Sequence, residues 1–112
     1  MVYLSGTMQF RGGMNEVMRQ AARLQRKIED TKKEAHDRTV EATGANEKVK
    51  VTANYGREIV RIEIDPEFLA SDRELALDAI AATANAALKL GAEAMEKEIN
   101  KVTGGLKIPG LT

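Results

Sequence analysis

Apolar residues recur at alternating spacings of three and four along the first part of the chain. The positions are Met14, Val17, Ala21, Leu24, Ile28, Thr31 and Ala35. On an α-helix this spacing forms a single stripe, typical of a heptad seam that packs against another helix. The pattern predicts a long helix from Met14. Residues 1–13 contain three glycines and no clear periodicity, so we expect them to form a flexible leader.

Strict alternation of apolar and polar residues replaces the helical spacing between residues 38 and 64. The apolar positions are Val40 and Ala42, then Val49, Val51 and Ala53, then Val60, Ile62 and Ile64. Alternation of this kind predicts half-buried strands, and the intervening turns are short. Gly56 is the residue expected to take a positive φ in the second turn. The segment therefore predicts a three-stranded antiparallel meander with one apolar face.

Two helix-start signals follow the strands. Asp65 before Pro66 combines a capping oxygen with a residue whose missing N–H costs nothing at the first helical position. It predicts a short turn through Leu69. Ser71 and Glu74 then match a capping box, in which each side chain bonds the other residue's amide. A second long helix is expected from there to about residue 103, before Gly104 and Gly105.

This second helix has two parts of different character. Its first half is rich in alanine and apolar almost all round, which predicts burial on more than one side. Its second half keeps a narrower stripe of Met95, Ile99 and Val102. Helices of about 30 residues span about 45 Å, whereas six-residue strands span about 20 Å, so the ends must protrude beyond the sheet. We expect the protruding stripes to pair with each other or with a second copy, most simply in a symmetric dimer.

Composition places the chain in a single domain with a thin core. It has 112 residues, of which 43% are apolar but only 4% aromatic, and it has no Cys. The absence of Cys excludes disulfides and thiolate metal sites. The sequence starts without a basic segment followed by an apolar run, and we find no stretch approaching about 18 apolar residues. These features predict a cytoplasmic protein with no membrane partner.

Charge is balanced overall but unevenly distributed. Lys and Arg total 17, as do Asp and Glu, which argues against a polybasic binder of the histone type. Residues 1–38 nevertheless carry 8 basic and 5 acidic side chains. At about 100° per residue, Arg19, Arg23 and Arg26 fall opposite the seam, with Lys27 beside them. This face is either a solvated surface or an anion-binding surface, and the absence of an acid between Arg19 and Lys27 favours anion binding.

We identify no cluster that would support catalysis. His36 is the only histidine and lies near the end of the first predicted helix, where a structural role is expected. Asp65 is interpreted as a cap. Gly104 and Gly105 are not followed by the lysine and hydroxyl residue of a phosphate loop. The chain is therefore expected to be no enzyme, with no metal, cofactor or small-molecule substrate.

The order of these segments resembles the YbaB/EbfC family of bacterial nucleoid-associated proteins, over roughly residues 14–111. The similarity is most specific in Val49–Asn54, Ile62–Pro66, Asn85–Ala87 and Gly104–Leu111. The resemblance implies an α+β domain at residues 14–105, a C-terminal tail at 106–112, and a homodimer whose paired long helices form tweezer-like arms. It also implies a DNA-binding protein of the nucleoid that influences gene expression.

Two function hypotheses come from this reading. In the first, the homodimer binds double-stranded DNA through Arg19, Arg23, Arg26, Lys27, Lys97 and Lys101, while the dimer contacts and core involve Met14, Val17, Ala21, Leu24, Ile28, Met95, Ile99 and Val102. In the second, the chain is a coiled-coil-like protein-interaction module without direct DNA binding. Overall neutrality and the scarcity of aromatic residues favour this alternative.

Overall fold

The computed structural model describes residues 2–104, with side chains from residue 13 onward. The elements are α1 (Val2–Ala35), β1 (Thr39–Gly44), β2 (Val49–Asn54), β3 (Ile59–Ile64), α2 (Pro66–Ser71) and α3 (Arg73–Thr103). The predicted α+β order of long helix, three strands, short helix and long helix is confirmed. The predicted C-terminal tail, residues 106–112, lies outside the described residues.

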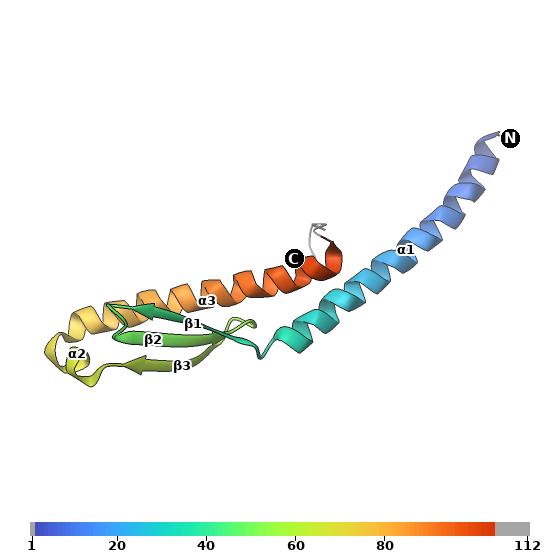
Figure 1. Ribbon diagram of the computed structural model, residues 1–112. Coiled ribbons are helices and arrows are strands. Elements are labelled where there is room, and N and C mark those ends of the chain that lie inside the picture. The colour runs from blue at the N-terminus through green and yellow to red at the C-terminus, as the bar shows by residue number, and fades with distance from the viewer. Residues whose placement is uncertain (1, 105–112) are drawn as a thin grey trace.

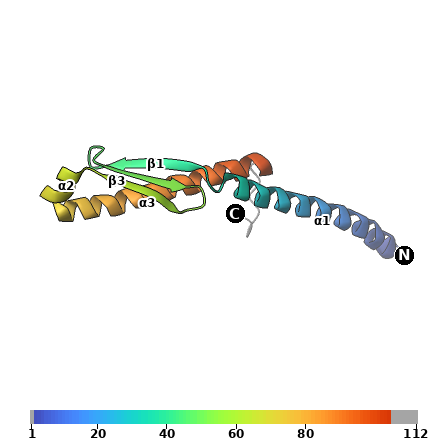
Figure 2. The same cartoon turned by 90° about the horizontal axis from the view of Figure 1, so that it is seen from below.

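The three strands form the predicted antiparallel meander, in the order β1-β2-β3. Val51 of β2 lies opposite Ala42 of β1 and Ile62 of β3, so the apolar positions of neighbouring strands are in register. A bulge interrupts the β2–β3 pairing at Thr52 and Ala53. Figures 1 and 2 show α3 running along the length of this sheet, with α2 at one end.

The core lies between β2 and α3. Val49, Val51 and Ala53 are fully buried, as are Ala76 and Ala87 of α3. Alanine on the facing side of α3 lets the helix backbone approach the sheet closely, which explains the alanine-rich composition of its first half. Phe68 of α2 closes one end of this cluster.

Helix α3 covers only part of the apolar face of the sheet. Cross-strand partners point to the same face, so Ile62 lies on the same side as its buried partner Val51. Because α3 packs mainly over β1 and β2, Ile62 of β3 is left 46% exposed. The bulge makes Ile59, not Val60, the partner of buried Ala53, and Ile59 is 39% exposed. The predicted apolar face exists, but at Ile59 and Ile62 of β3 it is only partly covered within the protomer, whereas Ile64 packs against the core.

Helix α1 starts at Val2, earlier than the predicted start at Met14. Residues 2–13 thus continue the helix, because each glycine lowers helix propensity by only about 1 kcal/mol and does not terminate a helix. Whether this segment is a flexible leader remains a prediction. Figure 1 shows α1 running past the end of α3 and away from the sheet. The longest dimension is 83 Å and the radius of gyration 22.5 Å. A compact domain of this size would have a radius of gyration of about 13 Å, so α1 is a projecting arm.

The helix boundaries confirm two predicted caps and correct a third. Asp65 accepts a hydrogen bond from the Glu67 amide at 3.3 Å, and Gly104 takes a left-handed φ of 63° at the end of α3. The predicted capping box is wrong. Because α2 continues through Ser71, the first residue free to cap α3 is Asp72, whose Oδ1 accepts from the Leu75 amide at 3.4 Å.

The predicted role of Gly56 in the second turn is also wrong. Arg57, with a φ of 64°, takes the positive φ there. Gly56 instead lies against the imidazole ring of His36, which a Cβ at this position would displace. The constraint is a close approach between the turn and the end of α1.

By length and composition alone, α3 is apolar enough to cross a membrane, contrary to the expectation from sequence. An 18-residue window has a mean hydropathy of 1.2, and 22% of it is buried within the protomer. One side of this helix is apolar because Ala76, Thr83 and Ala87 are buried against the sheet. Helices α1 and α2 pack against further parts of α3, and Leu75, Leu77 and Leu90 remain exposed.

Candidate nucleic-acid interface

The seam predicted on α1 divides into a buried and an exposed half. Ile28 and Ala35 are 2% and 1% exposed and lie in the stretch of α1 that packs against α3. Leu24 is half-buried, and the earlier seam residues Met14, Val17 and Ala21 are exposed.

The predicted stripe on α3 lies where α1 meets that helix. Ile99 is buried, and Met95 and Val102 are half-buried. Within one protomer this stripe does not cover Met14 and Val17, since both are about half exposed or more. Their contribution to a dimer remains a prediction.

The arginines of α1 lie opposite the buried seam. Arg19, Arg23 and Arg26 are all exposed, and Lys27 lies beside them with its side chain in solvent. Since Ile28 fixes which side of α1 faces α3, these cations point outward from the arm. The structure thus brings together the four cations of α1 that the sequence analysis selected.

Few acidic groups neutralise this surface. Arg19 lies 3.9 Å from Glu16, and both side chains are mostly exposed. A pair of this kind contributes about 0–1 kcal/mol in water and is easily exchanged for another anion. Among the residues with described side chains, no carboxylate lies within ion-pair distance of Arg23, Arg26 or Lys27.

Lys97 and Lys101 of α3 lie on a different surface. Both line a cleft of about 360 Å³ against β1, next to Val40 and Tyr55, which no α1 residue lines. Lys101 pairs with Glu98 at 3.2 Å, and Arg38 reaches the same carboxylate oxygen at 3.3 Å.

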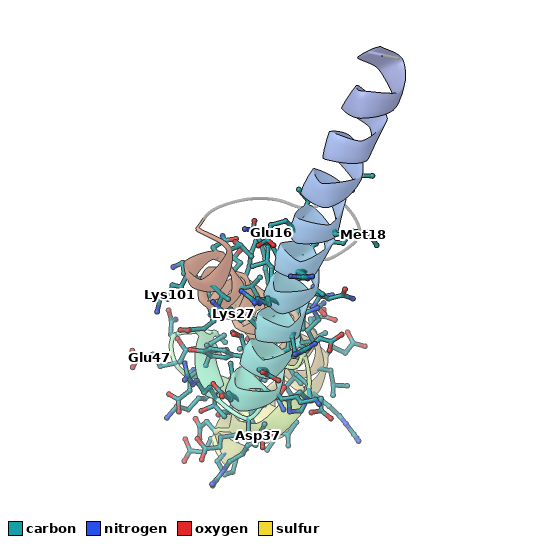
Figure 3. The ribbon with its side chains drawn as sticks, turned by 90° about the vertical axis from the view of Figure 1, so that its right-hand side faces the viewer. Glu16, Met18, Lys27, Asp37, Glu47 and Lys101 are labelled. Atoms are coloured by element: carbon teal, nitrogen blue, oxygen red, sulfur yellow. The ribbon has the colours of Figure 1, made fainter. Side chains whose placement is uncertain are left out.

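Figure 3 shows Lys27 on α1 and Lys101 on α3. The predicted set of six cations is therefore split between the arm and the cleft.

A cluster at the base of α1 was missed by sequence reasoning. His36 Nδ1 lies 2.8 Å from an oxygen of Asp37, and His36 Nε2 lies 3.2 Å from Glu58 Oε1. The hydrogen bond to Asp37 raises the pKa of His36, partial burial opposes that rise, and the charges of Glu58 and Asp37 add to it. Asp37 follows His36 directly in the sequence, so its proximity could be predicted. No sequence pattern predicts that Glu58 lies next to His36.

Asp65, the acidic residue considered for catalysis, has a structural role. Asp65 caps α2, as expected. Within the part of the chain that the structure describes, no group of three His, Asp or Glu side chains is arranged to hold a metal ion.

Comparison with known proteins identifies the family. Residues 10–106 match the YbaB/EbfC DNA-binding family, and the chain belongs to it. The chain is 43% identical over 101 residues to a nucleoid-associated protein of Pelotomaculum thermopropionicum, covering 89% of this chain and 96% of that one. It is 40% identical over 105 residues to a nucleoid-associated protein of Thermoanaerobacter pseudethanolicus, covering 91% and 95%. A nucleoid-associated protein of Myxococcus xanthus is 40% identical over 100 residues, covering 88% and 95%. The resemblance stated from the sequence is confirmed.

Proposed function

We propose that this protein binds double-stranded DNA as a homodimer, on the bacterial nucleoid, and thereby influences nucleoid organisation or gene expression. Membership of a DNA-binding family and the names of its relatives support this function over a protein-interaction module. The observation that carries the proposal is the arm itself. A helix that projects from the body presents four exposed cations on the side opposite its buried seam.

The chemistry of this surface suits the phosphate backbone. Arginine and lysine neutralise phosphates and release condensed counterions, which supplies affinity without requiring a base sequence. Arg23, Arg26 and Lys27 have no competing carboxylate among the described side chains, so a phosphate would not have to displace one. Two copies of the arm would double every contact.

Uncovered apolar surface supports the homodimer. The exposed large apolar residues are Met14, Val17 and Met18 on α1, Ile59, Val60 and Ile62 on β3, Leu69 on α2, and Leu75, Leu77 and Leu90 on α3. Neighbouring exposed apolar residues on one strand, as on β3, are typical of an interaction site. Edge strand β3 also has one side without a partner strand in the sheet. We assign the second copy to the apolar face beside β3, because a symmetric pair would cover it for both protomers.

A gel-shift series tests the DNA-binding part. Changing Arg19, Arg23 and Arg26 to Ala together should abolish most of the affinity for duplex DNA at low salt. The matched control changes Lys50, Arg61 and Arg73 to Ala, which removes the same charge from the body of the domain. Equal affinity of the two triple variants would show that the arm is not the binding surface.

Sedimentation of a paired set of variants tests the dimer. Ile62→Lys places a charge on the uncovered apolar face, and Thr39→Lys places the same charge on an exposed position of β1. We expect the wild type and Thr39→Lys to sediment as dimers and Ile62→Lys as a monomer. A wild type that sediments as a monomer would contradict the homodimer, and a dimeric Ile62→Lys would contradict this interface.

A further inference from the structure

The base of the α1 arm is tied to the turn between β2 and β3. Residues 36–38 form the only covalent link between α1 and the sheet. The Tyr55 amide donates to the Arg38 carbonyl at 2.8 Å, and the Gly56 amide donates to the His36 carbonyl at 3.2 Å. The direction of the arm therefore depends on this turn as well as on the packing of Ile28 and Ala35 against α3.

Glu58 is positioned in that turn by a buried asparagine. The Asn54 side chain is 6% exposed, and its Nδ2 donates to Glu58 Oε1 at 2.8 Å. The Glu58 amide in turn donates to Asn54 Oδ1 at 2.9 Å. These two bonds hold the carboxylate where it meets His36 Nε2. Glu58 thus connects the end of α1 to a buried residue of the sheet.

Helix α3 packs against Asn54, the buried residue of this connection. Gly91 lies so close to the Asn54 carbonyl that a Cβ on it would collide with that oxygen. On the opposite side, the His36 ring lies directly against Gly56. Contacts therefore run without a gap from α3, through Asn54 and Glu58, to His36, the residue that follows α1.

Only the protonated imidazole satisfies both acidic partners of His36. Neutral imidazole has one N–H, so it donates to either Asp37 or Glu58, and its other nitrogen turns a lone pair toward a carboxylate. Imidazolium donates from Nδ1 to Asp37 at 2.8 Å and places its positive charge beside Glu58 Oε1, 3.2 Å from Nε2, as an ion pair. Both carboxylates also attract the positive charge.

Other charged groups line the cleft beside the ring. Lys32 of α1, Arg57 of the turn and Lys89 of α3 line the same cleft, together with Glu93, Glu96 and the phenol of Tyr55. Three cations here disfavour imidazolium and two carboxylates favour it. The two acids in direct contact with the ring outweigh this nearly balanced outer set, because Coulomb interactions weaken with distance and screening.

We propose that His36 is a pH-sensitive positioning residue that holds the α1 arm against the β2–β3 turn when protonated and releases it when neutral. The folded protein binds the proton more tightly than free histidine, whose pKa is 6.5, because the pKa of His36 is raised. The hold is therefore complete below pH 6.5 and is lost as pH rises through the raised value. This inference concerns the free protein and does not depend on DNA binding.

Double electron–electron resonance, which measures the distance between two spin labels, tests the proposal directly. The chain has no Cys, so Gln20→Cys on the arm and Glu41→Cys on β1 accept labels without background. Dilution with unlabelled protein restricts the measured pair to one subunit. The width of the distance distribution should increase as pH rises from about 6 to about 8.5, across the titration of a histidine.

Variants separate His36 from a general effect of pH. In His36→Gln the distance distribution should be broad at both pH values. In Glu58→Gln its width should lose most of the dependence on pH. Glu93→Gln, which removes an acid from the same cleft without touching the imidazole, should behave as the wild type.

Circular dichroism checks that each variant is folded. If His36→Gln is not folded, the comparison of Glu58→Gln with the wild type tests the proposal. A wild-type width that does not change with pH would overturn the proposal. A pH response that persists in His36→Gln would also overturn it.

Discussion

Gly91 of α3 lies directly against the backbone carbonyl of Asn54 at the end of β2. This contact sets how closely α3 approaches the sheet at the point where the arm, the turn and the helix meet. Asn54 in turn holds Glu58, and Glu58 reaches His36, the residue that follows α1. A change at Gly91 should therefore affect both the stability of the domain and the position of the arm.

Gly91→Ala should destabilise the protein despite the higher helix propensity of alanine. The added methyl group meets backbone that cannot rotate away, and overpacking of this kind costs about 1–3 kcal/mol. Urea unfolding gives the free energy of unfolding. Gly13→Ala is the matched control, because a Cβ at this position on α1 meets nothing within 4 Å. It should be neutral or stabilising by up to about 1 kcal/mol, and equal effects of the two changes would contradict the close packing at Gly91.

Asp72→Ala should weaken the start of α3. Its carboxylate accepts from the Leu75 amide, and loss of a cap costs about 0.5–2 kcal/mol. Ser71→Ala should cost much less, because Ser71 lies in α2 and its side chain caps nothing in the structure. Thermal unfolding of the two variants distinguishes them. A larger loss for Ser71→Ala would restore the capping box that the sequence predicted.

Truncation of Ile28 tests the packing of the arm on α3. Ile28 is 2% exposed, and replacing a buried isoleucine with alanine costs about 2–5 kcal/mol. Gln25→Ala, one turn earlier and exposed, should change the free energy of unfolding by less than about 0.5 kcal/mol. Denaturant unfolding followed by circular dichroism measures both. A loss of stability as small as that of Gln25→Ala would show that α1 does not pack firmly against α3.

The stability of the protein should depend on pH through His36. The folded pKa is raised above the ordinary 6.5, so the stabilising contribution is complete below pH 6.5 and disappears as pH rises through the folded value. The free energy of unfolding of the wild type relative to His36→Gln should therefore be largest in mild acid and decline above neutrality. A difference that grows with pH would mean that the imidazole is held in its neutral form.

Much of the fold could be predicted because local pattern and tertiary contact agree. The alternation at Val49, Val51 and Ala53 predicts a strand with one buried face, and all three are fully buried. Gly104 ends α3 with the left-handed φ that its position suggested. The stop at Asp65 and Pro66 likewise depends only on neighbouring residues.

The failures share a different physical cause. The start of α3 depends on how far α2 continues, which the Ser71 and Glu74 spacing does not reveal. Gly56 lies against an imidazole distant in sequence, so a rule about turns identified the glycine but assigned it the wrong role.

The candidate interface was predictable where helical spacing alone determines direction, as for Arg19, Arg23 and Arg26. Helical spacing could not show that Lys97 and Lys101 line a separate cleft, because that depends on how α3 lies against β1. The pairing of His36 with Glu58 joins the end of α1 to the β2–β3 turn, and the sequence does not predict that these two segments lie together.

The salt dependence of DNA affinity tests the central proposal most directly. If two arms together neutralise about four to eight phosphates, the slope of log affinity against log salt should be roughly −4 to −7. Each cation removed reduces the slope by about 1, so changing Arg19, Arg23 and Arg26 to Ala in both subunits should make it nearly flat. The Lys50, Arg61 and Arg73 triple variant should keep the wild-type slope. A wild-type slope near zero, or an equal slope in the two triple variants, would contradict DNA binding through the arms.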